Sequence, residues 1–177
     1  RKWVREVKEK SFTQIYSLNE RLKELKKISK RKNFRFINLD LTNYKKTSSL
    51  IKKFKPDIIF HLAAQPSAPY ANSNPQRATY TNYNNNQSTL NMLWALKKNN
   101  LLKTIFVETT TTGVYGTPDF NINEGFNILN KNPIPFHNLG GSWYHISKSN
   151  DCNYLWLANR LWGLTVIDFR TAITLGL

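Results

Sequence analysis

The sequence predicts an α/β protein built on a parallel β-sheet. Apolar runs with the length of buried strands lie at 58–64, 103–108 and 164–169. Segments with apolar residues at helical spacing separate them, at about 75–99 and 142–162. Such alternation of strands and helices is typical of a parallel sheet with helices packed on its faces. The first run has no polar break, so we expect that strand to be buried on both faces.

Two further helices are expected before these strands. Ser17 and Glu20 have the spacing of a capping box, and leucines follow at helical spacing. A short strand is expected at 34–39. Thr42 or Asn43 then caps a helix that runs to about residue 54, where a Pro–Asp turn ends it.

The formal net charge of +15 is concentrated near the start of the chain. Residues 1–55 contain 18 lysines and arginines against 5 acidic residues, whereas 56–177 contain 8 against 6. A basic surface of this size can bind nucleic acid. The segment has neither zinc-finger spacing nor the aromatic pattern of RNA-binding domains. These absences favour a solvated helix surface and leave a basic nucleic-acid-binding module as an alternative.

Cysteine content and hydropathy indicate the setting in which the chain folds. Cys152 is the only cysteine, so no internal disulfide forms, which fits a reducing compartment. We expect Cys152 to be a small buried helix residue and predict no metal site. No apolar run approaches the roughly 20 residues of a membrane-spanning helix, and residues 1–5 do not resemble a signal peptide. We therefore expect a cytoplasmic protein without a membrane partner.

The residues that follow each strand are candidates for a site, because parallel sheets bind ligands at the carboxyl ends of their strands. Asp40 follows the strand at 34–39, and its carboxylate can accept from an adenine amino group. After the next strand, small residues let a cofactor approach the backbone; these candidates are Leu62, Ala63, Ala64 and Gln65. The strand at 103–108 is followed by hydroxyls at 109–112 that can donate to a substrate oxygen.

Tyr144 and Lys148 form the most informative pair in the sequence. Four residues apart in a helix, they lie on one face. A phenol has an ordinary pKa of about 10, and a nearby ammonium lowers it by favouring the phenolate. Thr111 can hydrogen-bond the same substrate hydroxyl. Together these side chains provide a base, a group that tunes it and a group that orients the substrate, as alcohol oxidation by hydride transfer requires.

Several motifs resemble the extended short-chain dehydrogenase/reductases, a family of NAD-dependent nucleotide-sugar epimerases and dehydratases. They are Asp40-Leu41, His61-Leu62-Ala63-Ala64, Thr111-Thr112-Gly113-Val114-Tyr115-Gly116 and the Tyr144/Lys148 pair. The resemblance implies a Rossmann-like doubly wound parallel sheet, an NAD(P)-binding domain over residues 1–177, and NAD as the cofactor. It assigns Thr111 as the catalytic hydroxyl. The implied cofactor-binding residues are Asp40, Leu41, Leu62, Ala63, Ala64, Gln65, Asn85, Thr109, Tyr144 and Lys148.

Two longer segments resemble a branch of this family that joins sulfite to UDP-glucose. The stretch 65–70 is similar to a sugar-facing loop of that branch, and 142–151 is similar to the helix that holds its tyrosine and lysine. The implied substrate-binding residues are Gln65, Ser67, Tyr70, Thr111, Thr112, Gly113 and Tyr144. His145 becomes a candidate for later proton transfers. It lies about 100° around the helix from Tyr144, so a structural or surface histidine is an equal alternative.

The sequence departs from that branch around the expected sugar site, at Ala64, Pro66, Val114 and Arg170. Another NAD-dependent epimerase or dehydratase therefore stays an alternative. We expect a domain truncated at both ends, without the Gly-rich turn that binds the cofactor pyrophosphate. The resemblance further implies a homodimer, and a plastid stroma location if the source is a photosynthetic eukaryote.

Overall fold

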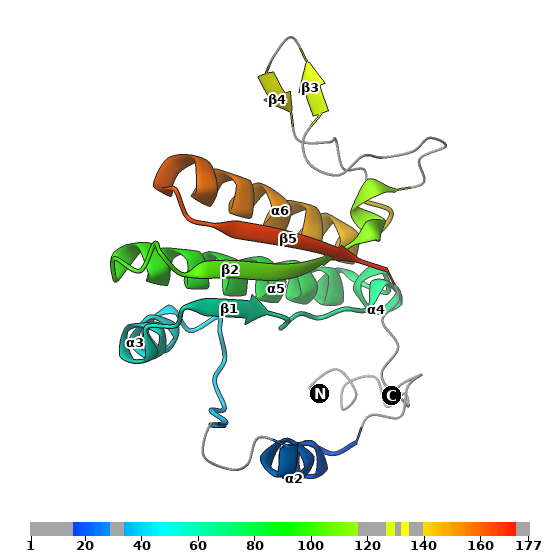
Figure 1. The fold of residues 1–177 in the computed structure, drawn as a ribbon. Helices are drawn as coiled ribbons and strands as arrows, with labels where there is room; N and C mark the ends of the chain where they lie inside the picture. The colour runs from blue at the N-terminus through cyan, green and yellow to red at the C-terminus, as the bar shows by residue number, and fades with distance from the viewer. Residues whose placement is uncertain (1–15, 29–33, 117–126, 130–131, 135–139, 173–177) are drawn as a thin grey trace. The chain divides into compact units, whose positions relative to one another are not determined.

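The structure is a computed structural model that describes residues 16–28, 34–116, 127–129, 132–134 and 140–172 (Figure 1). The chain divides into two compact units, Arg1–Asn38 and Leu39–Leu177. In the first unit, helix α2 spans Leu18–Ile28. The predicted capping box is confirmed there, because the backbone N–H of Ser17 donates to Glu20 at 2.8 Å and that of Glu20 donates to the Ser17 hydroxyl at 3.2 Å.

The second unit is built on a three-stranded parallel sheet. Its strands are β1 (Ile58–His61), β2 (Ile105–Thr111) and β5 (Val166–Thr171), in the order β1-β2-β5 (Figure 1). The predicted parallel α/β class is therefore confirmed. The strand expected at 34–39 is wrong: these residues form no strand. A strand needs a neighbour for its backbone hydrogen bonds, and none of the described strands pairs with this segment.

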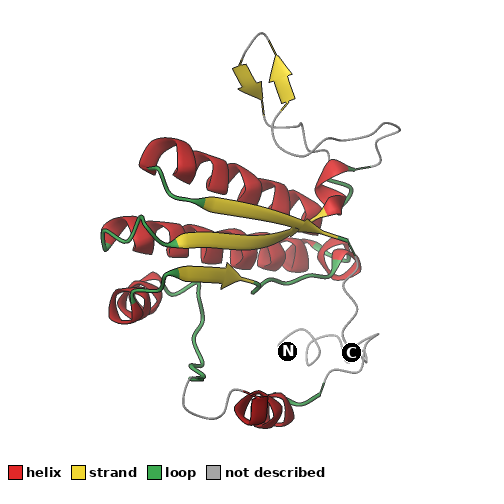
Figure 2. Cartoon of the chain, viewed as in Figure 1, coloured by secondary structure: helices red, strands yellow, loops and turns green. Residues whose placement is uncertain are grey.

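Three long helices cover one face of this sheet (Figures 1 and 2). They are α3 (Tyr44–Phe54), α5 (Pro75–Lys98) and α6 (Trp143–Trp162). Asn43 caps α3, as expected, by accepting from the backbone of Lys46 at 3.1 Å. Gly163 ends α6 in the left-handed conformation, with φ +67°. These local signals set the positions at which each helix begins and ends.

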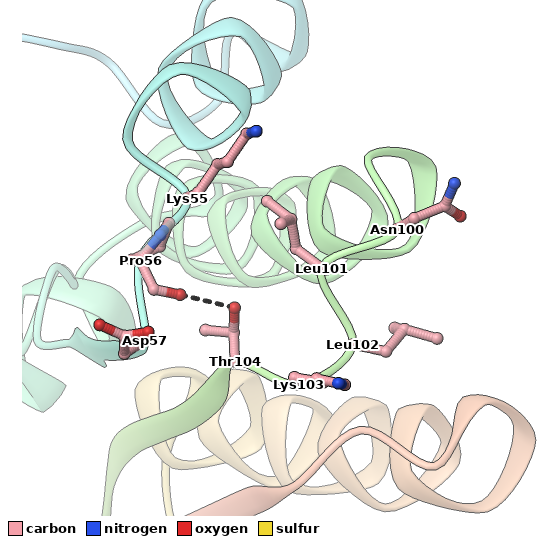
Figure 3. A pocket seen from close by; sticks show the side chains of 8 residues that line it. All are labelled: Lys55, Pro56, Asp57, Asn100, Leu101, Leu102, Lys103 and Thr104. Carbon is pink, nitrogen blue, oxygen red and sulfur yellow. Dashed lines mark hydrogen bonds between the residues drawn. The ribbon is translucent and has the colours of Figure 1, made fainter.

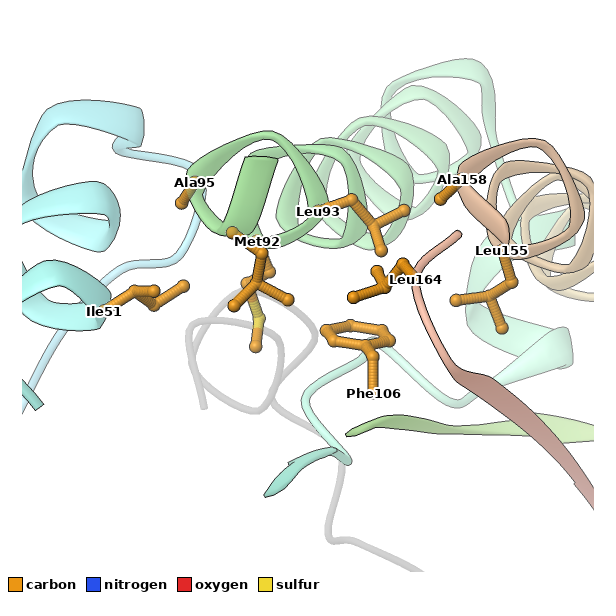
Figure 4. Close-up of a cluster of buried hydrophobic side chains, with 9 residues drawn as sticks. Ile51, Met92, Leu93, Ala95, Phe106, Leu155, Ala158 and Leu164 are labelled. Atoms are coloured by element: carbon orange, nitrogen blue, oxygen red, sulfur yellow. The ribbon is translucent and has the colours of Figure 1, made fainter. Parts of the chain in front are cut away.

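The apolar core lies between the sheet and these helices (Figure 4). Phe106 projects from β2 toward α5 and α6 and is fully buried. Each buried side chain of this size contributes roughly 1.5–3 kcal/mol. The buried cluster consists of Ile51, Met92, Leu93, Ala95, Leu96, Phe106, Leu155, Ala158 and Leu164. This packing fixes the α6 helix against the end of β2, where the site lies.

The opposite face of the sheet is exposed within the described part of the second unit. Ile58 is 49% exposed, Phe60 65% and Phe169 59%. The expectation that the first strand is buried on both faces is therefore wrong, and β1 also ends earlier, at His61. The reason is that α3, α5 and α6 all lie on the other face of the sheet.

Three short elements occur where the sequence suggested only a loop. Helix α4 spans Ala68–Asn72, and a 3-10 turn, η1, spans Thr112–Tyr115. An antiparallel hairpin joins β3 (Asn127–Leu129) to β4 (Asn132–Ile134). The hairpin lies in the segment between η1 and α6.

An open hollow of about 410 Å³ lies at the amino ends of β1 and β2 (Figure 3). The Thr104 hydroxyl donates to the backbone carbonyl of Pro56 at 2.7 Å across its floor. This hollow is at the end of the strands opposite to the candidate site. Among the described helices, none has the length and apolarity needed to cross a membrane.

Candidate active site

The first two turns of α6 place Tyr144 and Lys148. Ser142 begins the helix by accepting from the backbone N–H of His145 at 3.1 Å. Tyr144 is half-buried, whereas the Lys148 side chain is only 3% exposed. The helix therefore directs the lysine toward the sheet and leaves the phenol nearer to solvent.

The Lys148 ammonium is held by two carboxylates. Its Nζ donates to Glu108 Oε1 at 3.0 Å and to Asp151 Oδ2 at 3.2 Å. The Thr89 hydroxyl donates to the Glu108 carboxylate, and Asn86 Nδ2 donates to Asp151 Oδ1 at 2.9 Å. An ammonium has three N–H donors, so one stays available for an incoming hydroxyl. Lys148 is thus positioned by β2, α5 and its own helix.

Sequence reasoning missed the role of Glu108 and Asp151. One signal was present: Glu108 is an acidic residue directly after the apolar run Ile105–Val107. It alternates with buried Phe106 and Thr110 and therefore points to the helix-covered face. Asp151 lies three residues after Lys148, a spacing that brings the two together on a helix.

The pKa of the Tyr144 phenol is raised above its ordinary value. Burial is the main cause, Lys148 acts to lower it, and Asp151 acts to raise it. The expected effect of Lys148, which lowers the pKa of the phenol, is therefore present, but burial and Asp151 outweigh it. The reason is that burial disfavours the phenolate and the Asp151 carboxylate opposes the effect of the ammonium.

Gly113 provides a close contact between the end of β2 and the first turn of α6. A Cβ atom at Gly113 would lie 2.3 Å from His145 Nε2, so the imidazole packs directly on the glycine. The Thr111 hydroxyl oxygen accepts from the backbone N–H of Gly113 at 3.2 Å, which leaves its proton available as a donor. This contact joins the Thr111–Gly113 turn to His145 in the first turn of α6, and a shared role of Thr111 and Tyr144 at one substrate hydroxyl stays a prediction.

His145 is part of this contact and has an unusual environment. Burial lowers the pKa of its imidazole. Its Nδ1 atom is buried without a hydrogen-bond partner in the described part of the protein. Its ring centroid is 5.3 Å from that of Tyr144. A buried polar atom without a partner at a strand end is a natural point for a ligand hydrogen bond.

Asn85 ties the loop after β1 to α6. Its Oδ1 accepts from the backbone N–H of Gln65 at 2.8 Å, and its Nδ2 donates to the Ser147 hydroxyl at 2.9 Å. The Gln65 side-chain oxygen in turn accepts from the backbone of Ser67 at 3.0 Å. Asn85 and Gln65 therefore shape this loop, and their direct contact with a cofactor or sugar stays a prediction.

Two predicted substrate-binding residues have structural contacts of their own. Ser67 caps α4 by accepting from the backbone N–H of Tyr70 at 3.2 Å. Tyr70 is 4% exposed, and its ring lies edge-on to Tyr80 with the Arg77 guanidinium over it. A contact between Tyr70 and a sugar would therefore require its side chain to be uncovered.

The remaining predicted positions are Asp40 and Leu41, which follow no strand in the structure, and residues that follow or end β1 and β2. Asp40 is exposed, and its Oδ1 accepts from the backbone and hydroxyl of Thr42, which leaves Oδ2 for a ligand. Leu41 is half-buried, and its carbonyl accepts from Asn91. The other positions are Leu62, Ala63, Ala64, Thr109 and Thr112, of which Leu62, Ala63 and Thr112 are exposed.

The described residues fit the nicotinamide and ribose half of NAD. The loop at Ala63 and Ala64 offers backbone without bulky side chains. Lys148 retains one N–H donor, and His145 has an unpartnered ring nitrogen. No group of three or more metal-ligating side chains occurs among the residues that the structure describes.

The sheet and the residues on α6 define the class as a Rossmann-type α/β domain with a tyrosine–lysine pair. The sequence matches the family described as GDP-mannose 4,6 dehydratase over residues 4–136, most of the chain. The chain belongs to this family of extended short-chain dehydrogenase/reductases.

Two curated relatives are named UDP-sulfoquinovose synthase. The chloroplastic protein of Spinacia oleracea is 32% identical over 141 residues, and that of Sulfolobus acidocaldarius is 37% identical over 143 residues. Both alignments cover 77% of this chain but only 29% and 36% of the relatives. The chain thus spans about a third of their length.

Solved structures share the fold. A UDP-glucuronic acid 4-epimerase from Bacillus cereus, determined with NAD, aligns with a TM-score of 0.64 at 21% identity, covering 91% of this chain and 46% of that one. The enzyme WbmH from Bordetella bronchiseptica, determined with NAD⁺, aligns with a TM-score of 0.59 at 27% identity, covering 82% and 42%. The Rossmann-like fold predicted from the sequence is confirmed.

Proposed function

We propose that this chain provides the catalytic pair of an NAD-dependent nucleotide-sugar enzyme, a UDP-sulfoquinovose synthase that acts on UDP-glucose and sulfite. One observation supports the proposal: the first turn of α6, which carries Tyr144, packs on Gly113 through His145 at the carboxyl end of β2, and Lys148 one turn later is paired with Glu108 of β2. The two relatives of that name, at 32% and 37% identity, support the choice of substrate.

In this reaction Tyr144 moves the proton of the sugar 4-hydroxyl. Its Oη takes the proton while the 4-carbon is oxidised, and it returns the proton when the 4-ketone is reduced at the end. The ketone acidifies the hydrogen on C5, so water leaves across C5 and C6 and sulfite adds at C6. NAD, when bound, accepts the hydride from C4 and later returns it.

The other side chains orient and tune this proton transfer. Thr111 donates its hydroxyl proton to the sugar oxygen, because its own oxygen already accepts from Gly113. Lys148 acts to lower the pKa of the phenol and so favours the phenolate. His145, next to Tyr144, is the candidate for the proton steps at C5 and C6.

The test is a product assay on the enzyme purified at the full length of its gene product. With NAD, UDP-glucose and sulfite, liquid chromatography with mass spectrometry detects UDP-sulfoquinovose. A matched reaction without sulfite gives no sulfonated sugar. Absence of a sulfonated product in the complete reaction, despite bound NAD, contradicts the sulfite assignment.

A 4-epimerase is the second candidate, and the departures Ala64, Pro66, Val114 and Arg170 favour it. Arg170 donates to Asp168 at 2.7 Å, and its guanidinium lies over the ring of Tyr115, so Arg170 packs against η1. A UDP-N-acetylglucosamine 4-epimerase from Methanobrevibacter ruminantium aligns at 27% identity with a TM-score of 0.60. Conversion of UDP-glucose to its 4-epimer without sulfite identifies this alternative.

A homodimer formed through α5 and α6 completes the proposal. Trp94 is 51% exposed and Leu161 63%, and both lie on these helices. Light scattering of the purified protein measures its molar mass in solution. A monomeric mass at micromolar concentration excludes the homodimer. We place the enzyme in the cytoplasm, or in the plastid stroma of a photosynthetic eukaryote, which fractionation tests.

The basic segment at 1–55 leaves nucleic-acid binding as a third option. A shift in the mobility of generic DNA that weakens steeply with salt supports it. Retained turnover with no such shift excludes it.

A further inference from the structure

Glu108 lies beneath the catalytic pair and is fully buried. Its Oε1 accepts from Lys148 Nζ at 3.0 Å, and Thr89 donates to its two oxygens at 3.2 and 3.3 Å. Asp151 Oδ2 accepts from the same ammonium at 3.2 Å. The Lys148 ammonium is therefore in contact with two acids, and a cluster with both acids ionised carries one excess negative charge.

Within the described residues, the strands and helix packed around this cluster add no unpaired charge to it. On β1 the register partner of Glu108 is His61, and burial together with Lys148 lowers the pKa of that imidazole to about 3, which keeps it neutral. On β5 the register partner is Asp168, which is paired with Arg170. From α5, uncharged Thr89 and Asn86 face the acids.

One of the two acids is protonated near neutral pH. Burial and the neighbouring Asp151 raise the pKa of Glu108 to about 8, although Lys148 opposes this. Below that pH the cluster is neutral, and above it the cluster gains a negative charge. A negative charge there disfavours the Tyr144 phenolate, as Asp151 already does.

We propose that Glu108 is a positioning residue for the Tyr144–Lys148 pair: it holds the ammonium in place, and its ionisation sets how much positive charge the phenol experiences. The proposal rests on the proposed role of Tyr144 as the base. It adds a group that acts through Lys148 and does not touch substrate. Once ionised, the Glu108 carboxylate offsets the ammonium and keeps the pKa of the Tyr144 phenol higher than an unopposed ammonium would.

Glu108→Gln removes the charge of the carboxylate while it keeps the size of the side chain and one acceptor oxygen for Lys148. We expect the Tyr144 phenol, followed by NMR of ¹³Cζ-labelled tyrosine and assigned by its absence in Tyr144→Phe, to titrate about one pKa unit lower than in wild type. The acidic limb of the kcat/KM profile moves in the same direction. Asp57→Asn, which removes a carboxylate at the opposite end of the strands, is the matched control and leaves both unchanged.

Wild-type protein supplies a second readout that does not depend on the variant folding. NMR of ¹³Cδ-labelled glutamate is expected to show Glu108 titrating near 8. Titration of Glu108 in the ordinary acidic range overturns the proposal. So does a Glu108→Gln protein whose Tyr144 titrates as in wild type. If the wild-type enzyme turns over no nucleotide sugar, the proposed function is overturned. The NMR titrations of Glu108 and Tyr144 then still test the role of Glu108.

Discussion

Replacing Gly113 with alanine perturbs the contact on which the site depends. The new Cβ would lie 2.3 Å from His145 Nε2 and 2.5 Å from its Cδ2. Real Cβ atoms do not approach so closely, so the imidazole must swing away or the first turn of α6 must shift. We expect overpacking of this kind to cost about 1–3 kcal/mol of unfolding free energy.

The chain offers a matched control for this substitution. A Cβ at Gly141, just before α6, would have nothing within 4 Å. Gly141→Ala is therefore expected to be neutral or to stabilise by up to about 1 kcal/mol. Urea unfolding followed by circular dichroism gives the unfolding free energy of each variant. The two values are compared directly if the dependence of that free energy on urea concentration is the same in both proteins.

A double-mutant cycle isolates the cause. In a His145→Ala background the clash is gone, so Gly113→Ala should cost no more than about 0.5 kcal/mol. In the otherwise wild-type enzyme, displacement of the first turn of α6 by about 1 Å is expected to reduce kcat about 100-fold. Equal costs for Gly113→Ala in both backgrounds, or equal costs for the two glycines, would refute the packing described.

Three further predictions concern the scaffold. Leu155→Ala, at the centre of the buried cluster, should lower the unfolding free energy by about 2–5 kcal/mol in urea titrations, and a loss below 1 kcal/mol contradicts the packing. Asn85→Leu should raise KM more than it lowers kcat, because it frees the Gln65 loop, and an unchanged KM argues against this role. The folded-state pKa of His61 is about 3, below its ordinary 6.5, so the unfolded chain binds the proton first. Between pH 6.5 and 3 the unfolding free energy of wild type should therefore fall by about 4–5 kcal/mol relative to that of His61→Gln, because the opposite contribution of the raised Glu108 pKa is common to both proteins.

Much of the fold was predictable because its signals are local. Asn43, Ser142 and Gly163 mark helix ends through contacts with backbone only a few residues away. The segment 34–39 has the composition of a strand, but strand formation depends on a partner elsewhere in the chain. Exposure of Phe60 was likewise not readable from its own neighbours, because it depends on which face the helices cover.

In the site, too, local features were predictable from the sequence and contacts between distant residues were not. Tyr144 and Lys148 were found from spacing within one helix. Glu108 reaches Lys148 across 40 positions of sequence, so the offset of the ammonium charge was not predictable from the helix alone. The lowering effect of Lys148 on the Tyr144 pKa was predicted, whereas the opposing effects of burial and Asp151 were not.

Tyr144→Phe is the most direct test of the central claim, that the phenol transfers the proton of the sugar 4-hydroxyl. The measurement is the rate of UDP-glucose conversion by the NAD-loaded enzyme at saturating substrate, alongside wild type. We expect kcat to fall about 10²–10⁴-fold, as for loss of a general base, while NAD and UDP-glucose still bind. A Tyr144→Phe enzyme that converts UDP-glucose at the wild-type rate would contradict it.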